Sequence, residues 1–73
     1  MILQTIVSEN IRGFRLLRGL TQEALAAKSG MTTNFLSAFE RGKSGLGLGS
    51  IEKIAKVLKV EPNTLLIKDA YKQ

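Results

Sequence analysis

Glycine interrupts the helical pattern of this chain three times within its first 42 residues, at Gly19, Gly30 and Gly42. Threonine follows the first two interruptions within two residues, at Thr21 and Thr32. Glycine adopts positive φ angles without steric cost and so ends helices, whereas a threonine hydroxyl accepts an amide hydrogen bond at the start of the next helix. This alternation predicts several short helices joined by tight turns.

Apolar residues recur at helical spacing between and beyond these interruptions. The expected helices cover about residues 5–18, 22–29, 32–41, 48–58 and 62–71, and Pro62 suits the first position of the last one. The residues expected to face the core are Val7, Ile11, Phe14 and Leu17 in the first helix and Leu48, Ile51, Ile54, Ala55 and Leu58 in the fourth. Because no segment alternates apolar and polar residues, the prediction is an all-α fold of five helices.

Cysteine and histidine are both missing from the 73 residues. Their absence excludes disulfide frameworks, zinc fingers, thiolate nucleophiles and imidazole bases, and the six acidic residues are too scattered to suggest a catalytic pair. A chain of this length supports one hydrophobic core, and its apolar runs are too short to span a bilayer. We therefore expect one domain over residues 1–73 that is not an enzyme, binds no metal, cofactor or small molecule, and works in the cytoplasm at the nucleoid rather than at a membrane.

Basic residues outnumber acidic ones by 11 to 6, which gives a formal net charge of +5. This excess favours a polyanionic partner such as nucleic acid, but it fits an ordinary soluble basic protein equally well. Charge alone therefore leaves the function open.

Residues 22–39 form the part of the chain in which one helix can be held across another. A helix, a turn at Gly30 and a second helix fit within about 20 residues, which is the arrangement that presents one helix to a DNA groove. The side chains that have to face inward are Leu25, Met31, Leu36 and Phe39, and all four are apolar. Ala26 is small, as the close approach of the two helices requires, so the segment predicts a helix-turn-helix.

A longer set of residues extends this pattern over about residues 5–67: Arg15, Gly19-Leu20-Thr21-Gln22-Glu23, Leu25-Ala26, Gly30-Met31, Leu36-Ser37, Glu40-Arg41-Gly42-Lys43, Ile54-Ala55, Leu58 and Leu65-Leu66. Taken together, they resemble the lambda-repressor and Cro-like helix-turn-helix domains, also called the XRE family. The resemblance implies a compact five-helix, lambda-repressor-like domain with its helix-turn-helix at about residues 21–41 and a last helix, about 62–71, that closes the core. It also implies that the third helix enters the major groove of double-stranded DNA.

The residues that the resemblance places against base edges are Thr33, Asn34, Ser37 and Ala38. Thr33 and Asn34 lie in the first turn of the third helix, where side chains project beyond the helix end, and an asparagine amide can pair with N7 and N6 of adenine. Ala38 lies one turn further and can contact a thymine methyl group. The plainer alternatives are a merely solvated Asn34 and an Ala38 that only favours the helix.

The residues expected to contact phosphates are Gln22, Thr21, Thr32, Arg41, Lys43 and Ser44. Gln22 is assigned by the resemblance, and like Thr32 it lies at a helix N-terminus, where free amides attract anions. Arg41 and Lys43 lie in the loop after the third helix, where cations attract DNA without selecting a sequence. Both threonines can equally serve as helix caps alone. The resemblance further implies that Arg15 and Glu40 form an ion pair that braces the first helix against the third.

One recognition helix covers only a few base pairs, so a homodimer with a second helix one DNA turn away is expected. The chain has more apolar residues than one small core needs. The candidates for the dimer interface are Leu66, Ile67 and Tyr71, followed by the segment 2–6.

The function that follows is that of a sequence-specific transcriptional regulator, which acts as a repressor on a palindromic operator. Such a regulator would be similar to small phage repressors or restriction-modification controllers. The alternative is an antitoxin or protein-interaction module that binds a toxin or another partner protein and regulates its own operon. The sequence does not separate these contexts.

Overall fold

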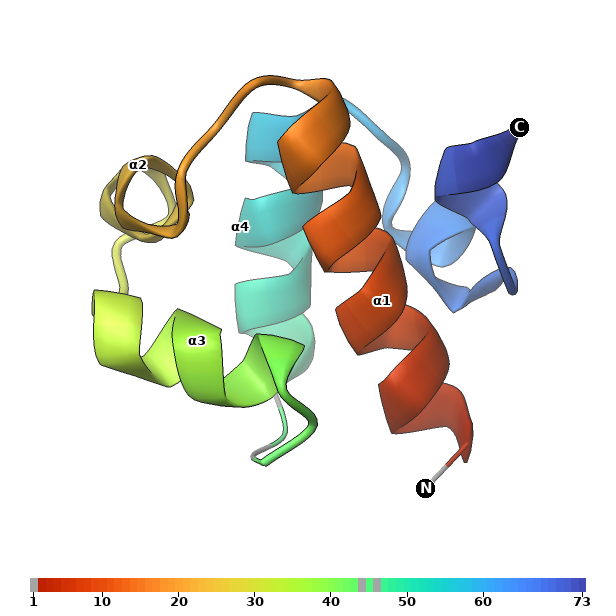
Figure 1. Ribbon diagram of the computed structural model, residues 1–73, viewed down its shortest axis with the longest axis horizontal. Coiled ribbons are helices and arrows are strands. Elements are labelled where there is room, and N and C mark those ends of the chain that lie inside the picture. The colour runs from red at the N-terminus through yellow and green to blue at the C-terminus, as the bar shows by residue number, and fades with distance from the viewer. Residues whose placement is uncertain (1, 44, 46) are drawn as a thin grey trace.

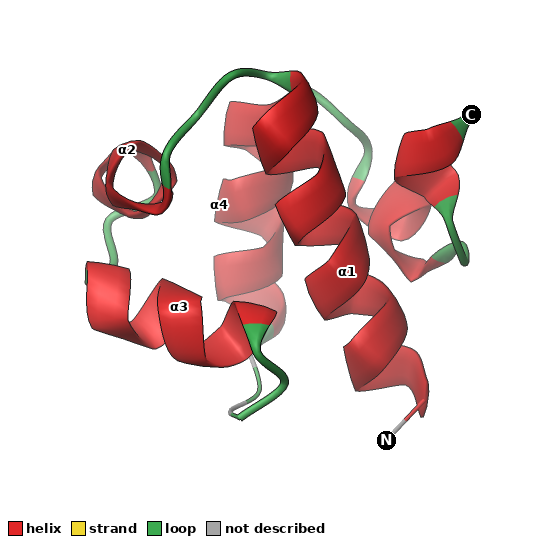
Figure 2. Ribbon diagram, viewed as in Figure 1, coloured by secondary structure: helices red, strands yellow, loops and turns green. Residues whose placement is uncertain are grey.

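The computed structural model describes residues 2–43, 45 and 47–73, and within them the chain forms four α-helices and two short 3₁₀ helices but no strand (Figure 1). The elements are α1 (Ile2–Leu17), α2 (Gln22–Lys28), α3 (Thr33–Glu40), α4 (Leu48–Leu58), η1 (Pro62–Leu66) and η2 (Ala70–Lys72). Figure 2 shows these helices joined only by loops. The all-α prediction is confirmed, whereas the count of five α-helices is wrong, because η1 and η2 replace the last one.

The helix α1 lies between two groups of elements (Figure 1). On one flank are α2 and α3, on the other flank is the C-terminal segment with η1 and η2, and α4 packs behind α1. Contrary to the expected bounds, α1 begins at Ile2 rather than near residue 5. The residues before Thr5 include no glycine or proline that would interrupt the helix. The predicted bounds of α4 are confirmed.

The same hydrogen-bond pattern ends all four α-helices of the described residues. In each case, one residue with a positive φ is followed by an amide that donates to a carbonyl five residues earlier, which is the Schellman motif. The amides and carbonyls are Leu20 and Arg15 (3.0 Å), Met31 and Ala26 (2.9 Å), Lys43 and Ala38 (2.8 Å), and Val60 and Ala55 (3.0 Å). The positive φ belongs to glycine in the first three motifs, as the sequence indicated, and to Lys59 (φ 62°) in the fourth.

Apolar side chains from all four α-helices and η1 meet in one core, whose buried members are Val7, Ile11, Phe14, Leu25, Ala26, Leu36, Phe39, Ile54, Ala55, Leu58 and Leu65. Two residues expected in this core are exposed: Leu17 keeps 61% and Leu48 82% of its accessible surface. Beside Phe14, the side chain that covers the ring at the end of α1 is that of the exposed Arg18, whose guanidinium lies 5.6 Å from the ring centre. Leu48 opens α4 and lies beyond the core.

The prediction of a helix over residues 62–71 is wrong because a distant side chain takes up the carbonyls that an α-helix would use. Asn10, which is fully buried in α1, donates from Nδ2 to the Leu65 carbonyl at 2.9 Å and to the Ile67 carbonyl at 2.7 Å. Ile67 is consequently extended, with φ −93° and ψ 123°, and the chain turns at Asp69, whose φ is 59°. Helical spacing alone does not reveal this interruption.

The end of the chain returns to α1 at a glycine. Gly13 is buried, and a methyl group at this position would overlap the ring of Tyr71. The absence of a side chain therefore lets the aromatic ring lie directly on the α1 backbone. Tyr71 is half-buried as a result, and Leu65 is the residue of η1 that closes the core.

Candidate nucleic-acid interface

Four residues, 29–32, join α2 to α3 and turn the chain sharply (Figure 1). Gly30 supplies the positive φ of this turn, 71°. The Thr21 hydroxyl accepts a hydrogen bond from the Ala24 amide at 3.0 Å, and the Thr32 hydroxyl accepts one from the Phe35 amide at 3.1 Å. Both helices are therefore capped by the threonines that the sequence indicated, and a helix-turn-helix results.

A buried ion pair fixes α3 against α1. The Arg15 guanidinium donates to both oxygens of the Glu40 carboxylate, from Nε at 2.9 Å and from Nη2 at 3.1 Å, and its Nη1 donates to the Leu20 carbonyl at 2.9 Å. The exposed fractions of the two side chains are 9% and 2%. Because two hydrogen bonds join the guanidinium to the carboxylate and both groups are almost fully buried, the contact fixes the relative orientation of the two side chains as well as their separation.

The same carboxylate holds the start of α2. Gln22 Nε2 donates to Glu40 Oε1 at 3.1 Å. The Gln22 side chain therefore links the beginning of α2 to the end of α3, and it is half-buried rather than fully exposed. The side chains of Arg15, Glu40 and Gln22 form what we call the brace, which sets the angle at which α3 is presented.

The outer face of α3 is polar and accessible. Since Leu36 and Phe39 point inward, a rotation of about 100° per residue places Asn34, Ser37 and Ala38 on the opposite side. Asn34 is exposed, and Ser37 and Ala38 are half-buried. Thr33 is also half-buried and lies at the first position of the helix. The structure thus brings the four sequence-predicted base contacts to one helix.

Cationic groups border this face. Arg41 and Lys43 are both exposed just after α3, and Arg41 Nη1 donates to the Ser37 hydroxyl at 3.2 Å. The guanidinium therefore folds back along α3, which adds a cation to a helix whose own residues include no base. Thr21 and Thr32 are exposed as well, and each capping hydroxyl keeps its proton for a second acceptor. The predicted phosphate contact Ser44 lies outside the described residues.

Two residues with structural roles were missed in the sequence, Phe35 on this surface and Asn10 on the other flank of α1. Phe35 keeps 37% of its surface exposed on α3, next to Asn34. The inward directions of Leu36 and Phe39 could have shown that Phe35 lies at the margin of the core. No local signal marks Asn10, because its partners lie 55 and 57 residues away.

A second accessible surface is apolar and lies between the start of α4 and η1. Its centre is a hollow of about 310 Å³ lined by Leu48, Ile51, Glu52, Pro62, Asn63 and Leu66. Leu66 and Ile67, two of the three expected dimer contacts, keep 46% and 54% of their surface exposed. The third, Tyr71, has its ring against Gly13.

Other kinds of site receive no support from the geometry. Within residues 2–43, 45 and 47–73, no group of three or more acidic, cysteine or histidine side chains is placed to hold a metal ion. None of the helices in the same residues is long and apolar enough to cross a membrane.

A helix-turn-helix family model, HTH_3, matches residues 11–65. A hypothetical transcription factor of Neisseria meningitidis serogroup B is 37% identical over 65 residues, which cover 89% of this chain and 61% of that protein, so the chain spans less than two thirds of its length. The solved restriction-modification controller protein C.AhdI from Aeromonas hydrophila superposes with a TM-score of 0.83 at 32% identity, over 89% of this chain and 98% of the other. SinR, a master regulator of biofilm formation solved in complex with DNA, superposes with a TM-score of 0.79 at 31% identity, over 84% and 98%.

Proposed function

The chain belongs to the HTH_3 helix-turn-helix family, the XRE-type DNA-binding transcription regulators, and from this premise we propose that it is a homodimeric repressor that binds a palindromic operator. The observation that carries the proposal is the brace, because it holds α3 at a fixed angle with Asn34 exposed on its outer face. Relatives with a matching fold are regulators rather than enzymes.

In this proposal, α3 lies in the major groove. The Asn34 amide pairs with adenine, and Thr33 and Ser37 donate or accept at neighbouring base edges. Ala38 and the exposed ring of Phe35 contact thymine methyl groups. Since Arg41 lies along α3 on Ser37, its guanidinium reaches either a phosphate or a guanine edge.

Phosphate contacts border the groove on both sides. Gln22, Thr21 and Thr32 lie at the beginnings of α2 and α3, where free amides and helix dipoles favour an anion. Lys43 and Ser44 follow α3, and we assign them to the backbone with Arg41. These contacts set orientation and salt dependence rather than sequence preference.

The apolar hollow between α4 and η1 is the surface we assign to the second copy of the chain. Leu48 and Leu66 border it and keep 82% and 46% of their surface exposed. A symmetric copy that packs on these leucines would remove apolar surface from water on both chains. Ile67 extends the same edge of the molecule. Tyr71 contributes only the face of its ring that Gly13 leaves free.

The similarity to C.AhdI favours a restriction-modification controller over a phage repressor as the biological context. A controller of this kind would regulate the genes beside its own operator. The identity of the neighbouring genes decides between these contexts.

Selection of bound sites from random duplexes tests the proposal. We expect a palindrome whose half-sites are one DNA turn apart, about 10 base pairs. Asn34→Ala should weaken binding to that palindrome by about 1–3 kcal/mol and leave binding to unrelated duplexes nearly unchanged. Lys43→Ala, the matched control, should weaken both equally and reduce the salt slope by about one. An unsymmetrical consensus, or equal losses for Asn34→Ala on all duplexes, would overturn the proposal.

A further inference from the structure

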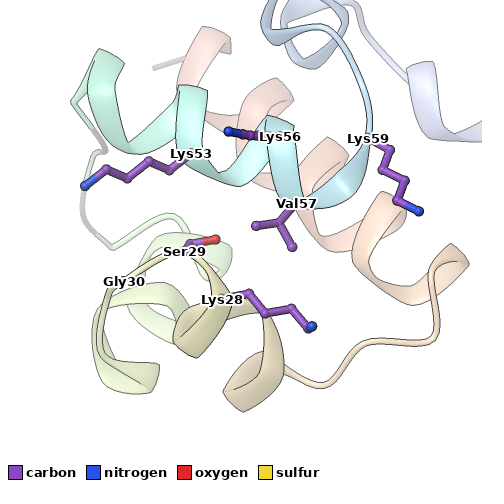
Figure 3. A pocket seen from close by; sticks show the side chains of 7 residues that line it. All are labelled: Lys28, Ser29, Gly30, Lys53, Lys56, Val57 and Lys59. Carbon is purple, nitrogen blue, oxygen red and sulfur yellow. The ribbon is translucent and has the colours of Figure 1, made fainter.

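A basic hollow of about 650 Å³ lies between the end of α2 and α4 (Figure 3). Its lining includes four lysines, Lys28, Lys53, Lys56 and Lys59, together with Ser29 and Val57. None of the residues assigned to DNA or to the second copy lines it. An adjoining hollow of about 250 Å³ shares Lys28, Val57 and Lys59 and adds Arg18.

The charge of this surface is uncompensated. No acidic side chain lines either hollow, and across the described residues none of the four lysines forms an ion pair. Arg18 is held in place at one end, since its Nε donates to the Leu58 carbonyl at 2.8 Å. Like charges gathered in a concave surface raise the local concentration of anions, so the hollow favours an anionic ligand.

Ser29 adds to the lining of the hollow a polar group that has no partner among the described residues of the protein. The residue is 4% exposed, and within the described part of the chain its hydroxyl has no hydrogen-bond partner. Figure 3 shows the hydroxyl oxygen directed toward α4, into the basic hollow. Buried hydroxyls are almost always paired in folded proteins, and a ligand acceptor in the hollow would supply the missing partner.

The arrangement of the lysines indicates what kind of anion fits. Figure 3 shows the four ammonium groups pointing in separate directions around Val57, so one phosphate cannot contact all of them. The surface instead has an apolar centre and a charged rim, which is the usual layout of a protein–protein interface. The deoxyribose groups of a nucleic-acid backbone are small and lie between charged phosphates, so they fill such a centre less well than an apolar amino-acid side chain.

We propose that the basic hollow binds an acidic polypeptide segment of a partner protein. Carboxylates of the segment would pair with the lysines of the rim, one apolar side chain would pack on Val57, and a carboxylate or backbone carbonyl would accept from Ser29. Because the hollow shares no residue with the assigned DNA contacts, the partner and the duplex would be bound together.

A synthetic peptide with a central leucine flanked by glutamates on both sides tests the proposal by NMR with the full-length isotope-labelled chain. We expect shifts at the amides of Ser29, Gly30 and Val57 but not at Asn34. The double variant Lys53→Glu with Lys56→Glu should lower the affinity for the peptide by about tenfold. The matched control, Lys68→Glu with Lys72→Glu, changes the net charge by the same amount at exposed positions outside the hollow and should leave the affinity nearly unchanged.

Three further measurements separate this site from simple charge attraction and from other anions. Replacing the central leucine of the peptide by serine should weaken binding severalfold. Ser29→Ala should also weaken binding while the melting temperature stays the same or rises, because the variant loses an unpaired buried hydroxyl. The proposal would be overturned if both double variants lost the same affinity for the peptide, or if the peptide shifted mainly the amides around Asn34. It would also be overturned if inorganic phosphate or an unrelated duplex shifted the amides of Ser29 and Val57 more strongly than the peptide does.

Discussion

The two flanks of α1 are held in different ways. On one flank, α2 and α3 begin and end at residues that lie beside them in the sequence, such as Thr21, Gly30 and Thr32. On the other flank, the C-terminal segment has its course set by Asn10, which lies 55 residues before Leu65. The first flank carries the assigned DNA contacts and the second presents Leu66 and Ile67.

This difference explains why neighbouring residues were enough to predict the helices on one flank but not on the other. Glycine turns and threonine caps act within one helical turn, so α2 and α3 form much as the sequence predicts. The C-terminal segment receives no comparable local instruction, and two long-range hydrogen bonds outweigh its helical spacing. On the helix-turn-helix flank, the long-range constraints are core packing against α1 and α4 and the brace, which acts through Arg15.

The largest expected effect comes from breaking the brace. Glu40→Gln leaves the Arg15 guanidinium buried beside a neutral amide, and we expect a loss of about 3 kcal/mol in the free energy of unfolding. The double variant Arg15→Met with Glu40→Met removes both charges and should recover most of this loss. Urea unfolding at one fixed protein concentration measures both, and a loss below about 1 kcal/mol for Glu40→Gln would show that local caps alone hold this flank.

Removing the Asn10 amide should have the next largest effect. Asn10→Ala leaves the buried Leu65 carbonyl without its donor and removes one of the two donors of the Ile67 carbonyl, which keeps the Ala70 amide at 3.1 Å. We expect a loss of about 2 kcal/mol in the free energy of unfolding. Hydrogen exchange should become faster in residues 62–72 and stay slow in α2 and α3. The exposed Asn63, changed to alanine, is the matched control. Equal exchange increases on both flanks would contradict the difference between them.

The contact of Gly13 with Tyr71 predicts that Gly13→Ala destabilises the unmodified protein but stabilises a variant that lacks the Tyr71 ring. Gly13→Ala places a methyl group where the Tyr71 ring lies and should destabilise the protein by about 1 kcal/mol or more. In a Tyr71→Ala background the same change should stabilise α1 by about 0.5–1 kcal/mol, because alanine favours helices. A thermodynamic cycle of the four proteins measures this coupling, and additive effects would show that the ring does not depend on Gly13.

The smallest predicted effect compares the ends of the four helices. Lys59 adopts the left-handed conformation that glycine adopts in the other three Schellman motifs. Lys59→Gly should therefore stabilise the protein by about 0.5–1 kcal/mol, as thermal and urea unfolding would show. Lys56→Gly, in the last turn of the same helix, is the opposite control and should destabilise by about 1 kcal/mol.

The sequence by itself determined the all-α class, the helix-turn-helix and the glycine ends of α1, α2 and α3. Hydrogen bonds between neighbouring residues and the steric freedom of glycine decide these features, and both can be read from residues a few positions apart. The family resemblance singled out Thr33, Asn34, Ser37 and Ala38 on the third helix, and the inward direction of Leu36 and Phe39 leaves the last three of them on its outer face.

Only the tertiary structure decided the features that depend on residues far apart in the chain. It showed Leu17 exposed and the Arg18 guanidinium over the Phe14 ring, two 3₁₀ helices in place of a fifth α-helix, and Gln22 sharing Glu40 with Arg15. It also gathered Lys28 with the lysines of α4 around a buried hydroxyl. The physical reason is that a side chain selects among partners only after folding has brought them within hydrogen-bonding or contact distance.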